Sequence, residues 1–366
     1  MKVILAHDHL NQIGGAEKVL AAFHHLYPEA PVYTLLFDRS AVGDFFQGWD
    51  IHHSFLESLP GGRRLFKWYV WLMPTAVEQL DVTEADLVIT SASALIKGVV
   101  VKPETTHICY CHTPTRYLWS DTHQYTSDLP QPKLVKRLLP FILTRLRTWD
   151  YLAAQRVDHF VANSNFVASR IRKYYRREAE VIYPPVDTAR WRQLAEPEDY
   201  FLIVSRLRPY KRVDLAIRAF NKLGIPLKVI GSGEQEEELK SLARPHIEFL
   251  GHVSDEVKAG YLARCRALIH PQEEDFGITA VEAMAAGRPV IAYDAGGARE
   301  TVLPEVTGKL FREQSWEALA DAVIRFRYAK FDPPTIQAHA QRFSTPRFYE
   351  EWQRYVKRIL NSSSHS

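Results

Sequence analysis

The feature that most constrains the fold is an alternation of short apolar runs with amphipathic helical patterns along most of the chain. A short run rich in Val, Ile and Leu is typical of a strand buried on both faces, and apolar residues at helical spacing are typical of a covering helix. Parallel strands need crossover connections, so the pattern predicts parallel sheets covered by helices on both faces. The expected strands are residues 2–6, 32–37, 87–90, 98–101, 107–111, 160–163, 201–205, 227–230, 247–250, 267–270 and 290–292.

Two adjacent prolines, Pro184 and Pro185, interrupt this alternation near the middle of the 366 residues. Paired prolines cannot continue a helix or a central strand, and the alternation restarts after them. We therefore predict an α/β fold with two Rossmann-like, doubly wound domains, residues 1–185 and 186–344. Residues 345–366 are expected to form a helix that packs back on the first domain, followed by a frayed tail. The carboxyl ends of both sets of strands are expected to face each other across a ligand-binding cleft.

Charge and cysteine content exclude several classes of protein. The net charge is +3, which is too balanced to indicate nucleic-acid binding. The three cysteines, Cys109, Cys111 and Cys265, are too few for a disulfide framework and match no zinc spacing, so buried free thiols are expected. The first residues show no signal peptide, and no apolar run reaches the roughly 18 residues of a spanning helix. A cytoplasmic protein is expected, or one peripheral at the inner face of the plasma membrane.

Glycine pairs follow two of the expected strands. Gly14 and Gly15 precede a helical pattern at residues 16–27, and Gly231 and Gly233 follow the strand at 227–230. Glycine lets the backbone approach a ligand closely, and a helix N-terminus favours an anion. A plain turn is the commoner explanation of Gly14 and Gly15, and the first strand of neither domain is followed by the G-x-G-x-x-G pattern of dinucleotide-binding domains.

Charged residues lie at the expected ligand-binding edge of the second domain. Arg206 and Lys211 come directly after the strand at 201–205, where cations suit a phosphate, although a solvated loop is an alternative. Glu274 and Glu282 are eight residues apart, in a loop and in the helical pattern that follows it. Two carboxylates there suit sugar hydroxyls, whereas the simpler interpretation makes both of them surface acids.

These motifs together resemble the retaining GT-B glycosyltransferases, known as glycosyl transferases group 1. Glu274 and Glu282 match the E-x7-E signature of that family, and Arg206 and Lys211 match its R-x4-K pair. The stretches at residues 109–117, 162–166 and 209–214 are similar to the bacterial O-antigen mannosyltransferase branch. The resemblance extends over essentially the whole chain. One departure is Asp275, where many members have Gly after the first Glu.

The resemblance implies roles at the matching positions. Glu282 would hold the ribose hydroxyls of the nucleotide, and Arg206 and Lys211 would neutralise its diphosphate. Glu274 and His112 would lie beside the donor sugar. The remaining substrate-binding positions implied are Gly14, Gly15, Gly231, Gly233, His252, Val253, Phe276, Gly277 and Ile278.

The activity expected from the resemblance is metal-independent, retaining transfer of a hexose. The donor is a nucleoside-diphosphate sugar, GDP-mannose or UDP-glucose, and the acceptor is a polysaccharide or lipid-linked oligosaccharide in bacterial envelope synthesis. No cofactor and no nucleic acid is expected as a partner. The alternatives are another GT-B enzyme acting on sugar nucleotides, an epimerase or a phosphorylase, and a non-catalytic sugar-nucleotide-binding protein. A dehydrogenase is disfavoured by the missing dinucleotide fingerprint.

The near-neutral charge conceals a basic segment at residues 133–177. Eleven Lys and Arg oppose two Asp there, a local charge of +9. Residues 133–149 are also amphipathic, and residues 63–71 form a second stretch of mixed basic and aromatic residues. Such segments bind anionic membrane surfaces, although a solvated helix face is the alternative.

Overall fold

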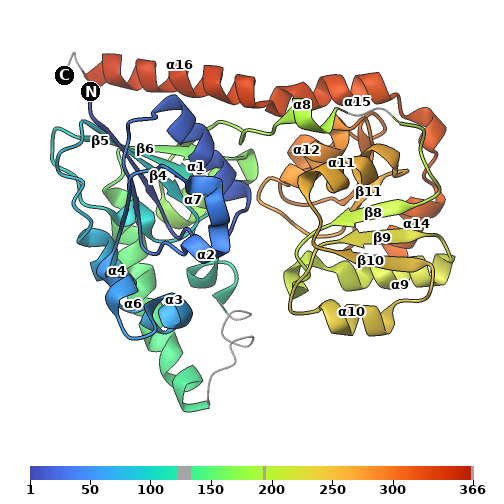
Figure 1. Ribbon diagram of the computed structural model, residues 1–366, viewed down its shortest axis with the longest axis horizontal. Helices are drawn as coiled ribbons and strands as arrows, with labels where there is room; N and C mark the ends of the chain where they lie inside the picture. Colours follow the sequence, from blue (N-terminus) through green and yellow to red (C-terminus); the bar gives the residue numbers. More distant parts are fainter. Residues whose placement is uncertain (123–132, 193–194, 364–366) are drawn as a thin grey trace. The chain divides into compact units, whose positions relative to one another are not determined.

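The computed structural model describes residues 1–122, 133–192 and 195–363. The chain divides into two compact units, residues 1–182 and 183–366 (Figure 1). Residues 361–363 of the expected frayed tail, 361–366, belong to the last helix, and residues 364–366 lie outside the described residues. The predicted packing of the last helix on the first domain stays a prediction. Within the described part of the chain, no helix has both the length and the apolarity to cross a bilayer.

Unit 1 is built on a parallel sheet with the strand order β3-β2-β1-β4-β5-β6-β7. The β1 strand is buried at every position, and so is β4, which pairs with it. The order reverses between β1 and β4, where ligands bind in doubly wound folds. The strands are β1 Val3–His7, β2 Val32–Thr34, β3 Ile51–His53, β4 Leu87–Ala92, β5 Thr106–Cys111, β6 His159–Ala162 and β7 Ala179–Val181. The helices are α1 Gly15–Leu26, α2 Arg39–Val42, α3 Gly62–Leu65, α4 Met73–Glu78, α6 Lys133–Gln155 and α7 Asn165–Tyr175.

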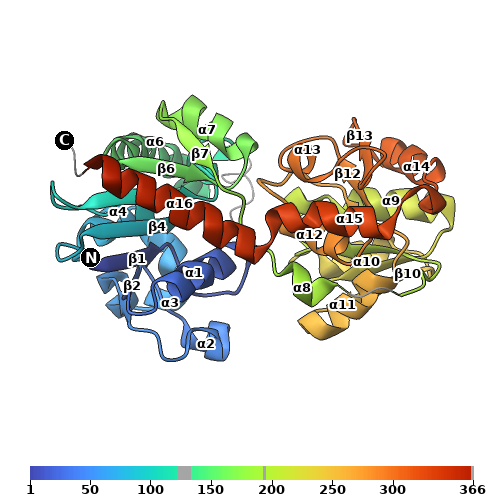
Figure 2. The same cartoon turned by 90° about the horizontal axis from the view of Figure 1, so that it is seen from above.

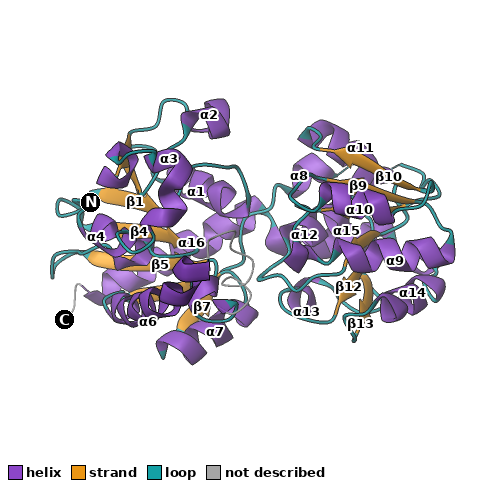
Figure 3. Ribbon diagram, turned by 90° about the horizontal axis from the view of Figure 1, so that it is seen from below, coloured by secondary structure: helices purple, strands orange, loops and turns teal. Residues whose placement is uncertain are grey.

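Unit 2 repeats this architecture with the order β10-β9-β8-β11-β12-β13, again all parallel in the described residues. The order reverses between β8 and β11. The strands, orange in Figure 3, are β8 Phe201–Val204, β9 Leu227–Ile230, β10 Ile247–Gly251, β11 Leu268–His270, β12 Val290–Tyr293 and β13 Gly308–Phe311. The helices are α8 Thr188–Trp191, α9 Val213–Leu223, α10 Glu236–Leu242, α11 Asp255–Arg264, α12 Ile278–Ala285, α13 Ala298–Thr301, α14 Trp316–Ile324, α15 Pro333–Ala340 and α16 Thr345–Ser363.

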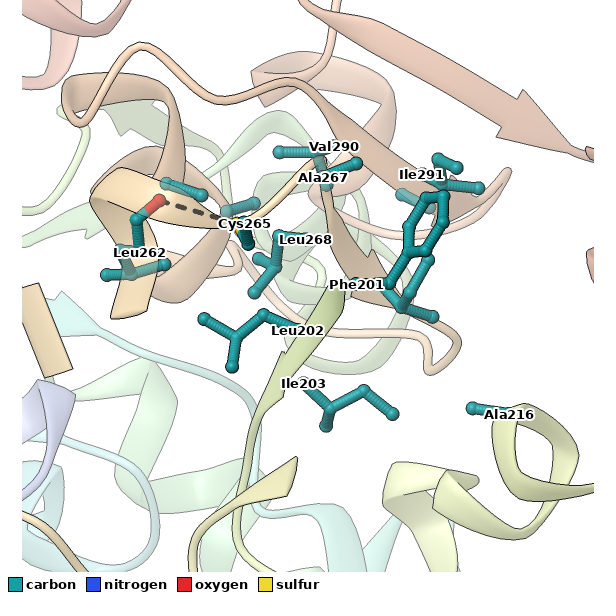
Figure 4. Close-up of a cluster of buried hydrophobic side chains, with 14 of the residues drawn as sticks. Phe201, Leu202, Ile203, Ala216, Leu262, Cys265, Ala267, Leu268, Val290 and Ile291 are labelled. Carbon is teal, nitrogen blue, oxygen red and sulfur yellow. Dashed lines mark hydrogen bonds between the residues drawn. The ribbon is translucent and has the colours of Figure 1, made fainter. Parts of the chain in front are cut away.

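Helices form two layers around the sheet of unit 2. The α12 helix packs against α8 and α15, and α9 packs against α14 and α10 (Figure 1, Figure 2). Between them lies an apolar core from β8, β11 and β12, which includes Phe201, Leu268 and Ile291 (Figure 4). The thiol of Cys265 is buried in this core and donates to the carbonyl of Leu262 (Figure 4). The expected Rossmann-like α/β architecture is thereby confirmed.

The cysteine side chains are buried and unbridged, as expected. Burial raises the pKa of Cys109 and of Cys265 to about 12, so neither thiol is a nucleophile at neutral pH.

One expected strand is wrong. Residues 98–101 form no strand; instead, Ile96–Gly98 is a turn of 3-10 helix. Gly98 faces the indole of Trp149, where an added Cβ would lie 2.4 Å from the ring. This apolar run therefore covers a helix rather than extending the sheet. The sequence pattern also missed β3, β7 and β13, which all lie at sheet edges.

Candidate functional site

The charged residues singled out in unit 2 lie at the carboxyl edge of its sheet, around the reversal of strand order. Arg206 and Lys211 follow β8, and Glu274 follows β11. The α12 helix carries Glu282 and begins after Gly277, whose φ of +90° favours glycine. Because β8 and β11 are neighbours, the loops after them start side by side.

Lys211 and Glu274 form an ion pair between these two loops. The exposed fraction of the side chain is 13% for Lys211 and 24% for Glu274, so the pair is partly shielded from water. Burial raises the pKa of Glu274, but the charges of Lys211 and His270 and two side-chain hydrogen bonds lower it by more, to about 2. Glu274 is therefore a carboxylate at neutral pH, with one oxygen held by a cation.

A second pair of side chains, His270 and Gln272, supports Glu274 from the end of β11. The Gln272 amide donates to Oε1 of Glu274 at 3.2 Å and lies 3.3 Å from Nδ1 of His270. Burial is the main cause that lowers the pKa of His270 to about 4. The charge of Lys211 also lowers this pKa, whereas the charge of Glu274 raises it. Among the described residues, Nε2 of His270 and Oε1 of Gln272 are buried without a hydrogen-bond partner. The sequence reasoning missed both, although their position at a strand end could have indicated them.

The loop that carries Glu274 is fixed by its backbone. The backbone carbonyl of Glu274 accepts a hydrogen bond from the N–H of Gly297 at 2.8 Å. A Cβ on Gly296 would lie 2.2 Å from that same carbonyl oxygen, and Gly296 has a φ of +58°. Phe276 is buried and packs on the rings of Tyr183 and Phe343. This glycine turn after β12 was also missed, because only tertiary packing brings it to the loop.

Glu282 is buried, with an exposed fraction of 4%, so it is not a surface acid. Its Oε2 lies 3.1 Å from Nζ of Lys258 on α11. Lys258 also lies 3.1 Å from Asp255 and over the ring of Trp191. Lys258 is another residue that the sequence did not reveal, since it lies 24 positions away on another helix.

The glycines after β9 have a structural role. A Cβ on Gly231, which has a φ of +130°, would lie 1.8 Å from the carbonyl oxygen of Ser205, and one on Gly233 would lie 2.3 Å from that of Leu207. The backbone N–H of Leu207 also donates to Ser232. Close approach of two loops therefore explains both glycines, and their contact with a substrate stays a prediction.

The remaining predicted residues of unit 2 lie on the same side of its sheet. His252 and Val253 come directly after β10, and the His252 side chain is exposed. Arg206 is exposed, whereas Ile278 at the start of α12 is half-buried. The structure thus brings Lys211 and Glu274 into direct contact, and it pairs Glu282 with a different lysine.

The predicted residues of unit 1 lie at the carboxyl edge of the other sheet. His112 follows β5 and is buried, with its Nε2 2.8 Å from Oγ of Ser91. Burial is the main cause that lowers the pKa of His112 to about 3, so the ring is neutral at pH 7. Gly14 caps α1, which begins at Gly15, and its N–H donates to the carboxylate of Glu17 at 2.8 Å. The described residues contain no group of three or more His, Cys, Asp or Glu that could hold a metal ion.

Comparison with known proteins finds a glycosyltransferase family model in each half of the chain. Residues 13–190 match the family model of glycosyltransferase family 4. The chain is 27% identical over 219 residues to the O-antigen chain mannosyltransferase C of Escherichia coli, covering 54% of this chain and 57% of that protein. It is 33% identical over 180 residues to glycogen synthase of Mycobacterium tuberculosis, covering 45% and 42%. The chain thus matches about half the length of these relatives.

Solved structures show the same fold over the whole chain. The crystal structure of Anabaena Alr3699/HepE in complex with UDP-glucose has a TM-score of 0.69 and 19% identity, and the match covers 98% of this chain and all of the other. This likeness supports the GT-B fold. Residues 186–328 match the family model of glycosyl transferases group 1. This range includes the Lys211–Glu274 pair and Glu282. The two family models, both of glycosyltransferases, thus match adjoining parts of the chain between residues 13 and 328.

Proposed function

We propose that the protein is a retaining hexosyltransferase that uses a nucleoside-diphosphate sugar. The observation that carries this proposal is the Lys211–Glu274 pair at the carboxyl edge of unit 2, followed eight residues later by the buried Glu282. The pair offers a cation for a diphosphate and a carboxylate for sugar hydroxyls at adjacent positions. Glu282 offers a second carboxylate for the ribose.

The reaction follows from where charge develops. The bond between the sugar C1 and the phosphate oxygen breaks, and Lys211 and Arg206 stabilise the charge that collects on the departing diphosphate. The acceptor oxygen forms its bond to C1 on the same face, and its proton passes to the departing phosphate oxygen. Two cations perform the task that a divalent metal performs elsewhere, so we propose a metal-independent reaction.

Donor binding then requires an exchange of partners. Lys211 and Glu274 hold each other in this structure, whereas the proposal gives Lys211 to the phosphate and Glu274 to the sugar. Gln272 still donates to Glu274 after the exchange, and the buried His270 supplies a neutral ring beside Gly277. The pair therefore keeps two charged groups satisfied until the donor replaces each partner.

The names of two relatives and one structural neighbour support the choice of two candidate donors. One matched relative is named a mannosyltransferase and another a glycogen synthase, and a structural neighbour holds UDP-glucose. GDP-mannose and UDP-glucose are the donors we propose. For the acceptor we propose a polysaccharide or lipid-linked oligosaccharide of a bacterial envelope, because the first of these relatives acts on an O-antigen chain by its name.

A donor screen tests this proposal. Purified protein is incubated with a panel of sugar nucleotides, and release of GDP and UDP is followed with and without EDTA. We expect release from one donor class, no loss with EDTA, and at least 100-fold slower release by Glu274→Gln and by Arg206→Ala combined with Lys211→Ala. Lys228→Ala is the matched control, since Lys228 also pairs with a glutamate but outside the site. Full turnover by the site variants would refute the assigned roles.

Product analysis separates the alternatives within the fold. A transferase yields a new glycosidic bond with retained anomeric configuration. An epimerase yields a changed free sugar or sugar nucleotide, and a phosphorylase yields a sugar phosphate from a glycan. Binding without turnover of any donor would favour a non-catalytic sugar-nucleotide-binding protein.

We further propose that unit 1 binds an anionic membrane surface. On α6, Phe141 is 73% exposed, and its neighbours on the exposed face include Arg137 and Arg145. Trp68 and Trp71 are 48% and 57% exposed in the second basic-aromatic stretch. Large apolar side chains beside arginines suit a lipid headgroup region. The side chains of Arg64, Lys67, residues 133–136 and Leu138 lie outside the described residues.

Vesicle flotation tests this second proposal. The protein is mixed with vesicles containing phosphatidylglycerol or only phosphatidylcholine. We expect binding to the anionic vesicles, lost at high salt and reduced by Trp71→Ser. Ile324→Ser is the matched control, because Ile324 in unit 2 is 56% exposed but lies outside the basic segment. Equal flotation with both lipids, or none, would contradict the proposal.

A further inference from the structure

A continuous chain of buried polar contacts joins His112 to the Gly14 loop. Nε2 of His112 lies 2.8 Å from Oγ of Ser91, and that oxygen lies 3.1 Å from Nδ1 of His7. On its other side, Nε2 of His7 lies 3.7 Å from Oε1 of Glu17. Oε2 of Glu17 accepts from the N–H of Gly14 at 2.8 Å. These contacts thus connect His112, after β5, with Gly14, before α1.

The parallel sheet sets the geometry of this chain. His7 is the last residue of β1 and pairs in register with Ser91 on β4, while His112 directly follows β5. Glu17 comes from the first turn of α1. Exposed fractions are 2% for His7, 0% for Ser91 and 3% for Glu17. Polar groups this deeply buried need partners, and the four side chains supply them to one another.

The ionised carboxylate of Glu17 determines which atoms donate and which accept along this series of buried contacts. Burial acts to raise the pKa of Glu17, but His7 and the Gly14 N–H hold it below its ordinary value, so the group is an ionised acceptor. A carboxylate favours a ring proton on the nitrogen that faces it, which is Nε2 of His7. In the tautomer that carries its one proton on Nε2, the ring of His7 accepts at Nδ1 from the hydroxyl of Ser91.

The same logic fixes the ring of His112. The hydroxyl of Ser91 has a single O–H donor, which it directs to Nδ1 of His7. Its oxygen must therefore accept a hydrogen bond from the Nε2–H of His112. The Nδ1 atom of His112 then carries a lone pair, and no described residue bonds to it. A neutral imidazole with an unprotonated Nδ1 accepts a hydrogen bond, as from a sugar hydroxyl.

We propose that Glu17, His7 and Ser91 are positioning residues that hold His112 with its proton on Nε2 and leave Nδ1 as an acceptor for a sugar hydroxyl of a substrate. The choice of ligand rests on the proposed function, whereas the position of the proton does not. The Gly14 N–H is bound to the same carboxylate, so one residue fixes both the glycine loop and the histidine.

Replacing Glu17 by Gln gives a defined reversal. The Gly14 N–H needs an acceptor and retains the amide oxygen, which turns the NH2 group toward His7. Nε2 of His7 then becomes an acceptor, its proton moves to Nδ1, and Ser91 donates to Nε2 of His112. The proton of His112 is thereby moved to Nδ1, with no change in side-chain size.

Long-range proton–nitrogen NMR on protein labelled with 15N-histidine measures these tautomers without any substrate. We expect His112, assigned by the loss of its signals in His112→Asn, to be protonated on Nε2 in the unmodified protein and in Glu17→Asp. In Glu17→Gln we expect the proton on Nδ1. His107 is the internal control, because its Nε2 lies 3.0 Å from Oγ1 of Thr90, outside the contacts that lead from His112 to Glu17. A proton on Nδ1 in the unmodified protein would overturn the proposal, as would an unchanged His112 in Glu17→Gln.

Ser91→Ala keeps the proposal open to refutation if Glu17→Gln does not fold. This variant removes the hydroxyl that links His112 to His7. The NMR signals of His112 should therefore change, while those of His7 should still show a proton on Nε2. In the transfer assay we expect kcat to fall roughly 10- to 100-fold in Glu17→Gln. The Kd of the nucleoside diphosphate alone should stay the same, because its proposed ligands lie in unit 2. A reversed tautomer with unchanged kcat would overturn the positioning role, and absent transfer by the unmodified protein would count against the proposed function alone.

Discussion

The Lys211–Glu274 pair allows a quantitative test of the electrostatics of the site. The pKa of Glu274 falls from 4.5 to about 2, which corresponds to roughly 3 kcal/mol in favour of the carboxylate. His270 is neutral at pH 7 because its pKa is about 4, so Lys211 is the cation responsible there. Gln272 shares the effect, and the exposed quarter of Glu274 adds solvent screening. We therefore expect a coupling free energy of about 2 kcal/mol between the two side chains.

A double-mutant cycle measures this coupling. Lys211→Met, Glu274→Gln and the double variant are unfolded in urea at pH 7 and at pH 3.5, without ligand. Because the folded pKa of Glu274 is depressed, its contribution is complete above pH 4.5 and is lost as the pH falls toward 2. The coupling should therefore be smaller at pH 3.5 by roughly 1 kcal/mol.

The control cycle uses Lys228 and Glu248, whose side chains are 24% and 55% exposed. Its coupling should stay under about 1 kcal/mol, as for surface pairs. A Lys211–Glu274 coupling no larger than that of the control, or one that does not change with pH, would refute the reasoning. The ion pair would then be a chance contact, and the partner exchange proposed for donor binding would lose its basis.

Two further predictions concern stability. Gly231→Ala should lower the free energy of unfolding in urea by about 3 kcal/mol, because the added Cβ would collide with a carbonyl oxygen at a residue of positive φ. The control Gly224→Ala also has a positive φ but no atom within 4 Å of the added Cβ, so it should cost only about 1 kcal/mol. Lys97→Met should cost about 3–5 kcal/mol because it leaves Asp150 buried without its cation, whereas Lys2→Met, at an exposed pair, should barely move the thermal midpoint. Equal losses in either matched pair would contradict the corresponding argument.

The fold was predictable where strands are buried on both faces. The central strands β1, β4, β8 and β11 read as apolar runs because helices cover both sides of a parallel sheet. The three edge strands that were missed are less clearly apolar: β7 reads Ala-Glu-Val, with no position fully buried. The run at residues 98–101 failed for the opposite reason, since burial against Trp149 gives the same apolar composition as burial in a sheet.

The residues of the site were likewise predictable only where they follow buried strands. Lys211 and Glu274 were predictable because each follows a buried strand, and strand order then brings residues 63 positions apart into contact. Lys258 and Gly296 reach their partners through helix and loop packing, which leaves no periodic signal in the sequence.

The buried polar chain in unit 1 shows what such packing adds. Glu17 reads in sequence as an ordinary first-turn acid of a helix, where it favours the helix dipole. Only the register of β1 with β4 places Ser91 beside His7, so that a helix-capping carboxylate also acts on a histidine two strands away. Both units therefore use one arrangement: a carboxylate that would be costly to bury alone is held by a neighbour from another strand end, and the neighbour is thereby oriented. Glu17→Gln should therefore alter the tautomer of His112, and Glu274→Gln the orientation of Lys211, more than either change alters the backbone around its site.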